Sequence, residues 1–139
     1  ALLEGRKQPS PHVGAYIQTD GSQGTDITQG GPTCLLWTTG AKTGKERCSA
    51  LNYMQDGDKV YVVGSLAGLD VHPHWVRNLE AKPLGAVQIH EKKWDVKVRK
   101  VSGDERVAIW PTLTAHFPLW GHFQQYQPRE FQVFELTPA

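Results

Sequence analysis

Three strand-like runs follow one another between residues 33 and 65 with no helical segment between them. The first, 33–39, is apolar and β-branched with little alternation, which is typical of a strand buried on both faces. A second run covers about 47–55, and a third covers 59–65 after the turn signal Asp56-Gly57-Asp58. Parallel strands need long crossover connections, so runs joined this closely are expected to pair as an antiparallel meander.

The remainder of the chain predicts short helices and further strands. Pro73 stands at the start of a helix over about 73–81, and Pro83 prevents its continuation. A second helix is expected from Asp104, after a Ser-Gly capping sequence, and Pro111 predicts either a kink or two consecutive short helices there. The further strands are expected at about 84–90, 93–102 and 131–136.

This pattern indicates a mainly β fold with about six antiparallel strands and two or three short helices, arranged as a small β-barrel with helices outside it or across its mouth. The length of 139 residues suits one domain, which we expect to cover residues 13–139. Residues 1–12 lack the apolar core of a signal peptide and are expected to form a flexible leader.

Charge and hydropathy exclude several classes of partner. The formal net charge is only +1, so no general attraction to nucleic acid or to an anionic membrane is expected. No apolar run reaches the ~18 residues that suggest a membrane span. Two cysteines, Cys34 and Cys48, are too few for a disulfide scaffold and are interpreted as reduced thiols. We therefore expect a cytoplasmic protein, to which a segment preceding Ala1 could add a membrane contact.

The connection between the first two strands, 38–47, concentrates groups that suit an anion. It holds two glycines, three threonine hydroxyls and three cations, which can turn backbone N–H groups and positive charge toward a phosphate. It is not a P-loop, because its glycines are one residue too close and Glu46 replaces the magnesium-binding hydroxyl. Sequence alone leaves a solvated surface turn about as probable as a phosphate site.

No self-sufficient catalytic motif accompanies this loop. His72 and His74 form an H-x-H pair, but no third ligand accompanies them, so no metal site is expected. Phe117, Trp120 and Phe123 fall on one helical face, where they either pack in the core or roof an apolar pocket. A phosphate loop and an aromatic wall without catalytic side chains suggest a reaction whose chemistry a cofactor supplies.

Four separated motifs resemble those of the deazaflavin (coenzyme F420)-dependent nitroreductase family, and the match extends over about residues 13–138. The motifs are Leu35-Leu36 to Thr39; Gly40-Ala41-Lys42-Thr43-Gly44 with Arg47; Asp56-Gly57-Asp58 with the strand to Ser65; and His72-Pro73-His74-Trp75 with Asn78-Leu79-Glu80-Ala81-Lys82-Pro83. The closing Arg129-Glu130 also fits. The resemblance implies a split β-barrel like that of FMN-binding relatives, with reduced F420 as the hydride donor.

The same resemblance implies roles for individual residues. The cofactor's phosphate and acidic tail are assigned to Lys42, Thr43, Gly44 and Arg47, with Thr38 and Thr39 also at the cofactor. The deazaflavin would be lined by Val63, Gly64 and Ser65, and its ring and ribityl region held by Pro73, His74, Trp75 and Asn78. The acceptor is assigned to Phe117, Trp120 and Phe123, and the Ser65 hydroxyl or strand N–H groups would stabilise developing negative charge.

The chain departs from the family pattern at two places. Ala41 stands where the family usually has arginine, so Lys42 and Arg47, with Lys45 as a further candidate, must hold the anion. Apolar aromatics also replace the tyrosines expected on the late helix, so a proton would have to come from His116, His122 or water. We therefore expect weak reduction of nitroimidazole-type substrates and better reduction of planar lactones, enones or quinones.

The predicted function is hydride transfer from F420H2 to electron-poor conjugated acceptors, namely enones, coumarin- or furanocoumarin-type lactones, quinones and, less well, nitroaromatics. Two alternatives remain open at this point. One is a non-catalytic protein that binds or stores F420 or FMN, and the other is an FMN-dependent split-barrel oxidase. The partner is expected to be a small aromatic acceptor, and the protein a monomer or a homodimer.

Overall fold

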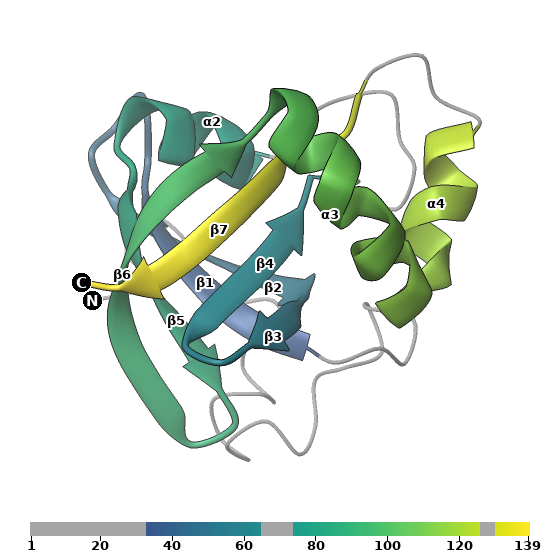
Figure 1. Cartoon of the computed structure of the whole chain (residues 1–139). Coiled ribbons are helices and arrows are strands. Elements are labelled where there is room, and N and C mark those ends of the chain that lie inside the picture. The colour runs from purple at the N-terminus through teal and green to yellow at the C-terminus, as the bar shows by residue number, and fades with distance from the viewer. Residues whose placement is uncertain (1–32, 65–73, 126–129) are drawn as a thin grey trace.

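The computed structural model describes residues 33–64, 74–125 and 130–139, which form a curled antiparallel sheet flanked by helices (Figure 1). Within these residues there are seven strands and three helices. The strands are β1 (Thr33–Thr39), β2 (Glu46–Asn52), β3 (Met54–Asp56), β4 (Lys59–Val63), β5 (Leu84–Ile89), β6 (Lys92–Val101) and β7 (Val133–Pro138). The helices are α2 (His74–Ala81), α3 (Gly103–His116) and α4 (Pro118–Gln125). The mainly β fold and its antiparallel pairing are confirmed; the expected leader lies outside the described residues.

The sheet order, β2-β1-β5-β6-β7-β4-β3, shows how the sheet curls. β2 and β3 lie at opposite ends of this order, yet only Tyr53 separates them in sequence. Because consecutive Cα atoms are about 3.8 Å apart, the two edges of the sheet must meet at this residue. The sheet therefore curls into a half-barrel whose two edge strands are joined at Tyr53, as Figure 1 shows.

The prediction of one strand over 47–55 was wrong, because the run divides at Tyr53. Its first part pairs with β1, where Asn52 lies opposite Thr33, and its second part pairs with β4, where Met54 lies opposite Tyr61. The meander is thus present, but its middle strand changes partner halfway. This change raises the strand number from the expected six to seven in the described residues.

The expectation that the first strand is buried on both faces is confirmed by two separate clusters. Cys34 and Leu36 face the main core, which α2 closes with Val76 and Leu79. The alternate residues of β1, including Leu35, are equally buried on the other face, in a smaller cluster with Cys48 of β2. Both cysteines are free thiols inside these clusters.

A third cluster lies where α3 and α4 pack against the ends of β4 and β7, at the right of Figure 1. Leu113 of α3 and Trp120 of α4 are its deeply buried helical members, and Val63 and Phe131 belong to the same cluster. Phe117, between the two helices, meets Trp120 edge to face with ring centroids 5.2 Å apart. This cluster fixes the two helices to the sheet.

The helix interruption expected at Pro111 is instead found at Phe117. α3 continues through Pro111, whose missing N–H leaves one helical hydrogen bond unmade on an exposed part of the helix. The helix ends where the Phe117 N–H donates to the Leu113 carbonyl at 2.9 Å, and Pro118 occupies the first turn of α4, a position that proline favours. Ser102 occupies the N-cap of α3 but makes no side-chain cap hydrogen bond. Among the described helices, none is long and apolar enough to cross a membrane.

Candidate functional site

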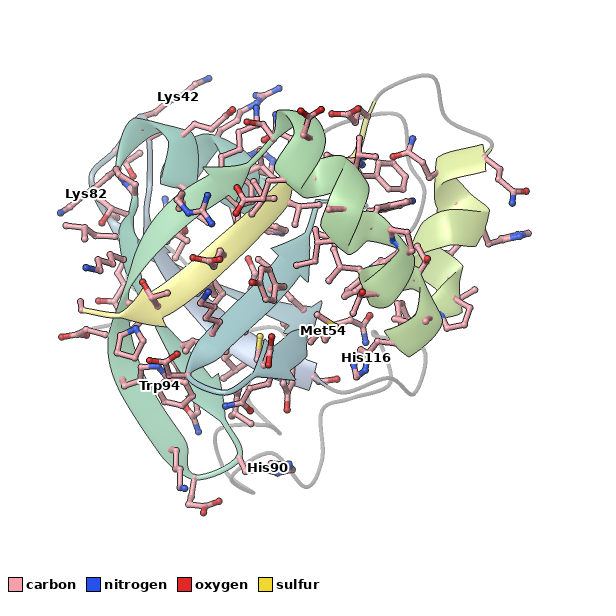
Figure 2. The ribbon with its side chains drawn as sticks, viewed as in Figure 1. Lys42, Met54, Lys82, His90, Trp94 and His116 are labelled. Atoms are coloured by element: carbon pink, nitrogen blue, oxygen red, sulfur yellow. The ribbon has the colours of Figure 1, made fainter. Side chains whose placement is uncertain are left out.

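A groove of about 370 Å³ lies between α2 and the β1–β2 loop, residues 40–45. Figure 2 shows Lys42 of this loop projecting outward at the edge of the molecule. Residues of the loop, of β2 and of α2 share the lining, so segments separated by about thirty positions meet here. The lining residues are Gly40, Ala41, Lys42, Thr43, Arg47, Ser49, His74, Trp75, Arg77 and Asn78.

The loop is closed by hydrogen bonds of its own backbone. The Gly40 N–H donates to the Lys45 carbonyl at 2.7 Å, and the Gly44 N–H donates to the Gly40 carbonyl at 2.9 Å. Gly44 has a φ of +70°, a conformation that costs a glycine little and that other residues rarely adopt. The second glycine of the motif is therefore needed for the turn itself.

Asn78 fastens this loop to α2. Its buried side-chain amide donates to the Thr38 hydroxyl at 3.0 Å and accepts the Ala41 N–H at 2.9 Å. Both ends of the amide are thus used within the protein. Asn78 acts on the groove as a positioning residue that holds the start of the loop against the helix.

Thr43 has a similar positioning role at the other end of the loop. Its hydroxyl accepts the Lys45 N–H at 3.2 Å and lies 3.4 Å from Nη2 of Arg47. The Arg47 guanidinium also contacts the Glu46 carbonyl at 3.4 Å. These contacts direct a half-buried cation along the side of the groove.

The electrostatics of the groove suit an anion. None of its ten lining residues is an aspartate or glutamate, whereas Lys42, Arg47 and Arg77 are cations. Within the described part of the chain, the N–H groups of Lys42 and Thr43 have no hydrogen-bond partner, and Lys42 has no ion-pair partner. Backbone N–H donors and cationic side chains on a tight loop are a general arrangement for binding phosphate.

The structure brings together a large part of the set predicted for the cofactor. Lys42, Thr43, Arg47, His74 and Asn78 line the groove, and Thr38 is reached through Asn78. Trp75 also borders it but is only 4% exposed, because its ring packs edge to face on Phe134 in the core.

Other predicted cofactor residues lie elsewhere. Thr39 and Gly44 line a neighbouring hollow of about 320 Å³, whose lining mixes Lys93 with Glu46 and Asp95.

Val63 packs under α3, in the cluster with Leu113. Gly64 follows it, with its N–H donating to the Gln132 carbonyl at 2.8 Å. Ser65 and Pro73 lie outside the described residues. Contact of these residues with a cofactor stays a prediction.

The aromatic residues predicted for the acceptor divide by burial. Phe117 and Trp120 are 9% and 2% exposed and belong to the core cluster of α3 and α4, while Phe123 is half-buried beside it. Of the nearby histidines, His116 contacts the Tyr53 carbonyl at 3.1 Å (Figure 2), and His122 lies against Phe123. Neither histidine lines the groove.

Four lining residues were not among the predicted site residues: Gly40, Ala41, Ser49 and Arg77. Arg77 follows His74 by three positions, so helical periodicity places both on one face. That spacing could have identified Arg77. In the residues that the structure describes, no cluster of three or more potential metal-ligating side chains occurs.

Comparison with protein families gives one match over nearly the whole chain. A family model described as F420H(2)-dependent quinone reductase matches residues 10–138. An F420H(2)-dependent quinone reductase of Mycobacterium tuberculosis is 37% identical to this chain over 129 residues, which are 91% of this chain and 87% of the relative.

Solved structures give the same picture at the level of the fold. An F420-H2 dependent reductase, FDR-A, has a TM-score of 0.69 and 33% identity, covering 76% of this chain and 93% of its own. A protein described as a domain-swapped dimer has a TM-score of 0.70 and 30% identity, covering 91% of this chain and 99% of its own. The haem storage protein HutZ of Vibrio cholerae, 19% identical with a TM-score of 0.59 over 83% of this chain and 87% of its own, shares the fold.

Proposed function

The chain belongs to the F420H(2)-dependent quinone reductase family, and on that basis we propose that the groove between α2 and the β1–β2 loop binds the phosphate and acidic tail of the cofactor. The protein is an F420H2-dependent oxidoreductase, and reduced coenzyme F420 is its cofactor. The observation that carries the assignment is the donor set of the groove, which combines three cationic side chains and the N–H groups of Lys42 and Thr43 with a lining free of carboxylates.

Each groove residue has a defined task in this proposal. Lys42 and the N–H groups of Lys42 and Thr43 bind the phosphate, and Arg47 adds a second cation that Thr43 orients. Asn78 keeps the loop in place. A charge-assisted hydrogen bond contributes about 1.5–3 kcal/mol, so these contacts together could provide much of the binding energy.

When bound, reduced F420 supplies a hydride to the acceptor, which takes up one further proton. The protein contributes orientation of the two partners and exclusion of water. We propose that Val63, Gly64, Ser65, Pro73, His74 and Trp75 lie along the deazaflavin and ribityl portions. We propose that His116, His122 or solvent provides the proton, because Phe117, Trp120 and Phe123 carry no hydroxyl that could donate it.

For the acceptor we propose quinones first, followed by enones and coumarin- or furanocoumarin-type lactones, with nitroaromatics as poor substrates. The support is the apolar character of the late helix, where Phe123 is the most accessible of the three predicted contact residues. A planar conjugated ring can stack there without the hydroxyl partner that a nitro group would use. The alternatives of a storage protein or an FMN oxidase rest on the shared fold alone.

The acceptor proposal can be tested by oxidising F420H2 with a matched panel of acceptors under anaerobic conditions. We expect kcat/KM to be highest for quinones and at least tenfold lower for a nitroimidazole. Equal or faster reduction of the nitroimidazole would show that the apolar helix does not select the acceptor. Absence of oxidation with every acceptor would contradict the reductase function itself.

We further propose that the protein is a homodimer, since one protein of known structure at 30% identity is described as a domain-swapped dimer. Light scattering coupled to size-exclusion chromatography should give about twice the chain mass of 15.5 kDa. A mass equal to that of one chain would contradict the dimer.

A further inference from the structure

We infer that Arg77 binds a carboxylate of the cofactor's acidic tail and so makes the groove selective for F420 over a deazaflavin that lacks the phosphate and tail. This inference rests on the function proposed above. It concerns a second anion-binding position, on the α2 wall of the groove, opposite the loop that carries Lys42.

The position of Arg77 on α2 leaves it available to a ligand. Its neighbours Trp75, Val76, Asn78 and Leu79 are buried, whereas Arg77 and His74 are exposed and line the groove. Residues three apart lie on one face of a helix, so these two side chains share the groove side of α2.

The intramolecular partner that Arg77 would ordinarily have is already engaged. Glu80 lies three positions further along α2, a spacing that suits an ion pair. Instead, Glu80 lies 3.9 Å from Nζ of Lys100 on β6. No ion pair or hydrogen bond of the Arg77 side chain occurs within the described residues.

Other arginines of the described chain show how unusual this is. Arg99 forms a bidentate pair with Glu105 at 2.6 and 2.7 Å, and Arg106 donates to the Phe131 carbonyl at 2.8 and 3.1 Å. Arg77 is thus a guanidinium without a protein acceptor, in a groove without carboxylates. A guanidinium fork matches a carboxylate geometrically, which favours a carboxylate of the tail as its ligand.

The size of the groove supports two anionic groups. A volume of about 370 Å³ exceeds what one phosphate requires, and the cations come from two walls. Lys42 and Arg47 on the loop side meet the phosphate, which leaves Arg77 for a group further along the ligand. The ligand class that fits is a polyanion carrying a phosphate followed by carboxylates.

The test measures equilibrium binding, by deazaflavin fluorescence, of two ligands to the full chain: F420 and the deazaflavin lacking phosphate and tail. Arg77→Ala should raise the Kd for F420 about tenfold and leave that for the truncated ligand unchanged. Arg77→Lys should have a Kd for F420 between those of Arg77→Ala and the wild type. Lys82→Ala is the matched control, because Lys82 is an exposed cation just beyond α2 that does not line the groove (Figure 2).

Two results would overturn the inference. An unchanged Kd for F420 in Arg77→Ala would show that Arg77 is a solvated surface cation. An equal loss of affinity for both ligands would show that Arg77 acts on the deazaflavin ring or on the stability of the fold. We expect the variants to have the melting temperature of the wild type. A lower melting temperature would identify an effect on the fold. Failure of the wild type to bind F420 would instead contradict the function on which the inference rests.

Discussion

The side chain of Asn78 joins α2 to the β1–β2 loop through two hydrogen bonds that use both ends of its amide. The loop itself is exposed from Ala41 to Lys45 and contributes no residue to the core clusters. Among the described residues, these two hydrogen bonds are the ones that join the start of the loop to the helix. The proposed anion site is thus positioned by Asn78, whose side-chain oxygen and nitrogen both bond to protein groups.

Asn78→Ala should destabilise the protein and weaken F420 binding together. The substitution leaves the Ala41 N–H and the buried Thr38 hydroxyl without their partner, at a cost of about 2 kcal/mol. Urea unfolding and fluorescence titration measure the two effects. Thr38→Val, which removes only one of the two bonds, should produce a smaller change in the same direction. An unchanged Kd for F420 in Asn78→Ala would show that the loop keeps its place unaided.

Removal of both loop-side cations should act on cofactor binding more than on the chemical step. We expect Lys42→Ala combined with Arg47→Ala to raise KM for F420H2 by tenfold or more with a modest change in kcat, because the phosphate is remote from the reacting carbon. Steady-state kinetics with one quinone provides the measurement. Lys45→Ala is the control, since Lys45 is an exposed cation of the same loop outside the groove. If the control and the double variant behaved alike, the loop would act only through its general charge.

At the scale of residues, the sequence predicted the loop well and its opposite wall less well. Lys42, Thr43 and Arg47 carried a recognisable motif, and they do line the groove. The exact tasks of Thr43 and Asn78 depended on hydrogen bonds between distant segments, which no local pattern encodes. Arg77 belonged to no motif, although its spacing from His74 could have indicated it, and the pairing of Glu80 with Lys100 depends on the tertiary fold.

At the scale of elements, β4, β6, β7 and α3 are joined by one polar network around Glu135. This carboxylate on β7 is 7% exposed, accepts the Tyr61 hydroxyl at 3.1 Å and pairs with Arg99 at 3.0 Å, while Arg99 also holds Glu105 of α3. Burial and the hydrogen bond to Glu135 raise the pKa of Tyr61 to about 12. The network links α3 to the strands beneath it.

The raised pKa of Tyr61 predicts a loss of stability in alkali. The unfolded chain releases the phenolic proton near pH 10 and the native state only near pH 12, so the stabilisation is complete below pH 10 and is lost between these values. Urea unfolding from pH 8 to 12 should show a steeper fall for the wild type than for Tyr61→Phe. Equal slopes would mean that Tyr61 titrates normally in the native state.

The helix α4 allows its packing role to be separated from a role in acceptor binding. Trp120→Ala should lower the free energy of unfolding by about 3–5 kcal/mol, because the indole is almost fully buried.

Phe123→Ala, at a half-buried position, should raise KM for a quinone and leave the Kd for F420 unchanged. An unaltered KM for the quinone in Phe123→Ala would show that Phe123 contributes to packing and not to acceptor binding.

The ends of the strands and helices were predicted less well from the sequence than their types. The division of β2 and β3 at Tyr53 depends on which strand lies opposite, β1 or β4, and both halves have the same local character. Likewise α3 continues through Pro111, where the turn is exposed, and ends at Phe117, just before Pro118 begins α4. The types of these elements were predictable, but their ends depended on tertiary contacts.

In the whole molecule, the groove beside the β1–β2 loop and the core cluster that contains Phe117 and Trp120 lie at different helices. α2 borders the groove, whereas α3 and α4 cover the cluster with Phe117 and Trp120 (Figure 1). A cofactor anchored by its anionic portion on one element can thus present its reactive end to residues supplied by others. Separate places for the anionic and the reactive parts of the ligand agree with a family whose reaction depends on a bound cofactor.

The most direct test of this account compares electron donors in one anaerobic assay with a fixed quinone. The account predicts that F420H2 is oxidised in a quinone-dependent, saturable reaction and that reduced FMN, which lacks the acidic tail, is oxidised far more slowly. Oxidation of reduced FMN at an equal or higher rate, or tight F420 binding without quinone-dependent oxidation, would contradict it.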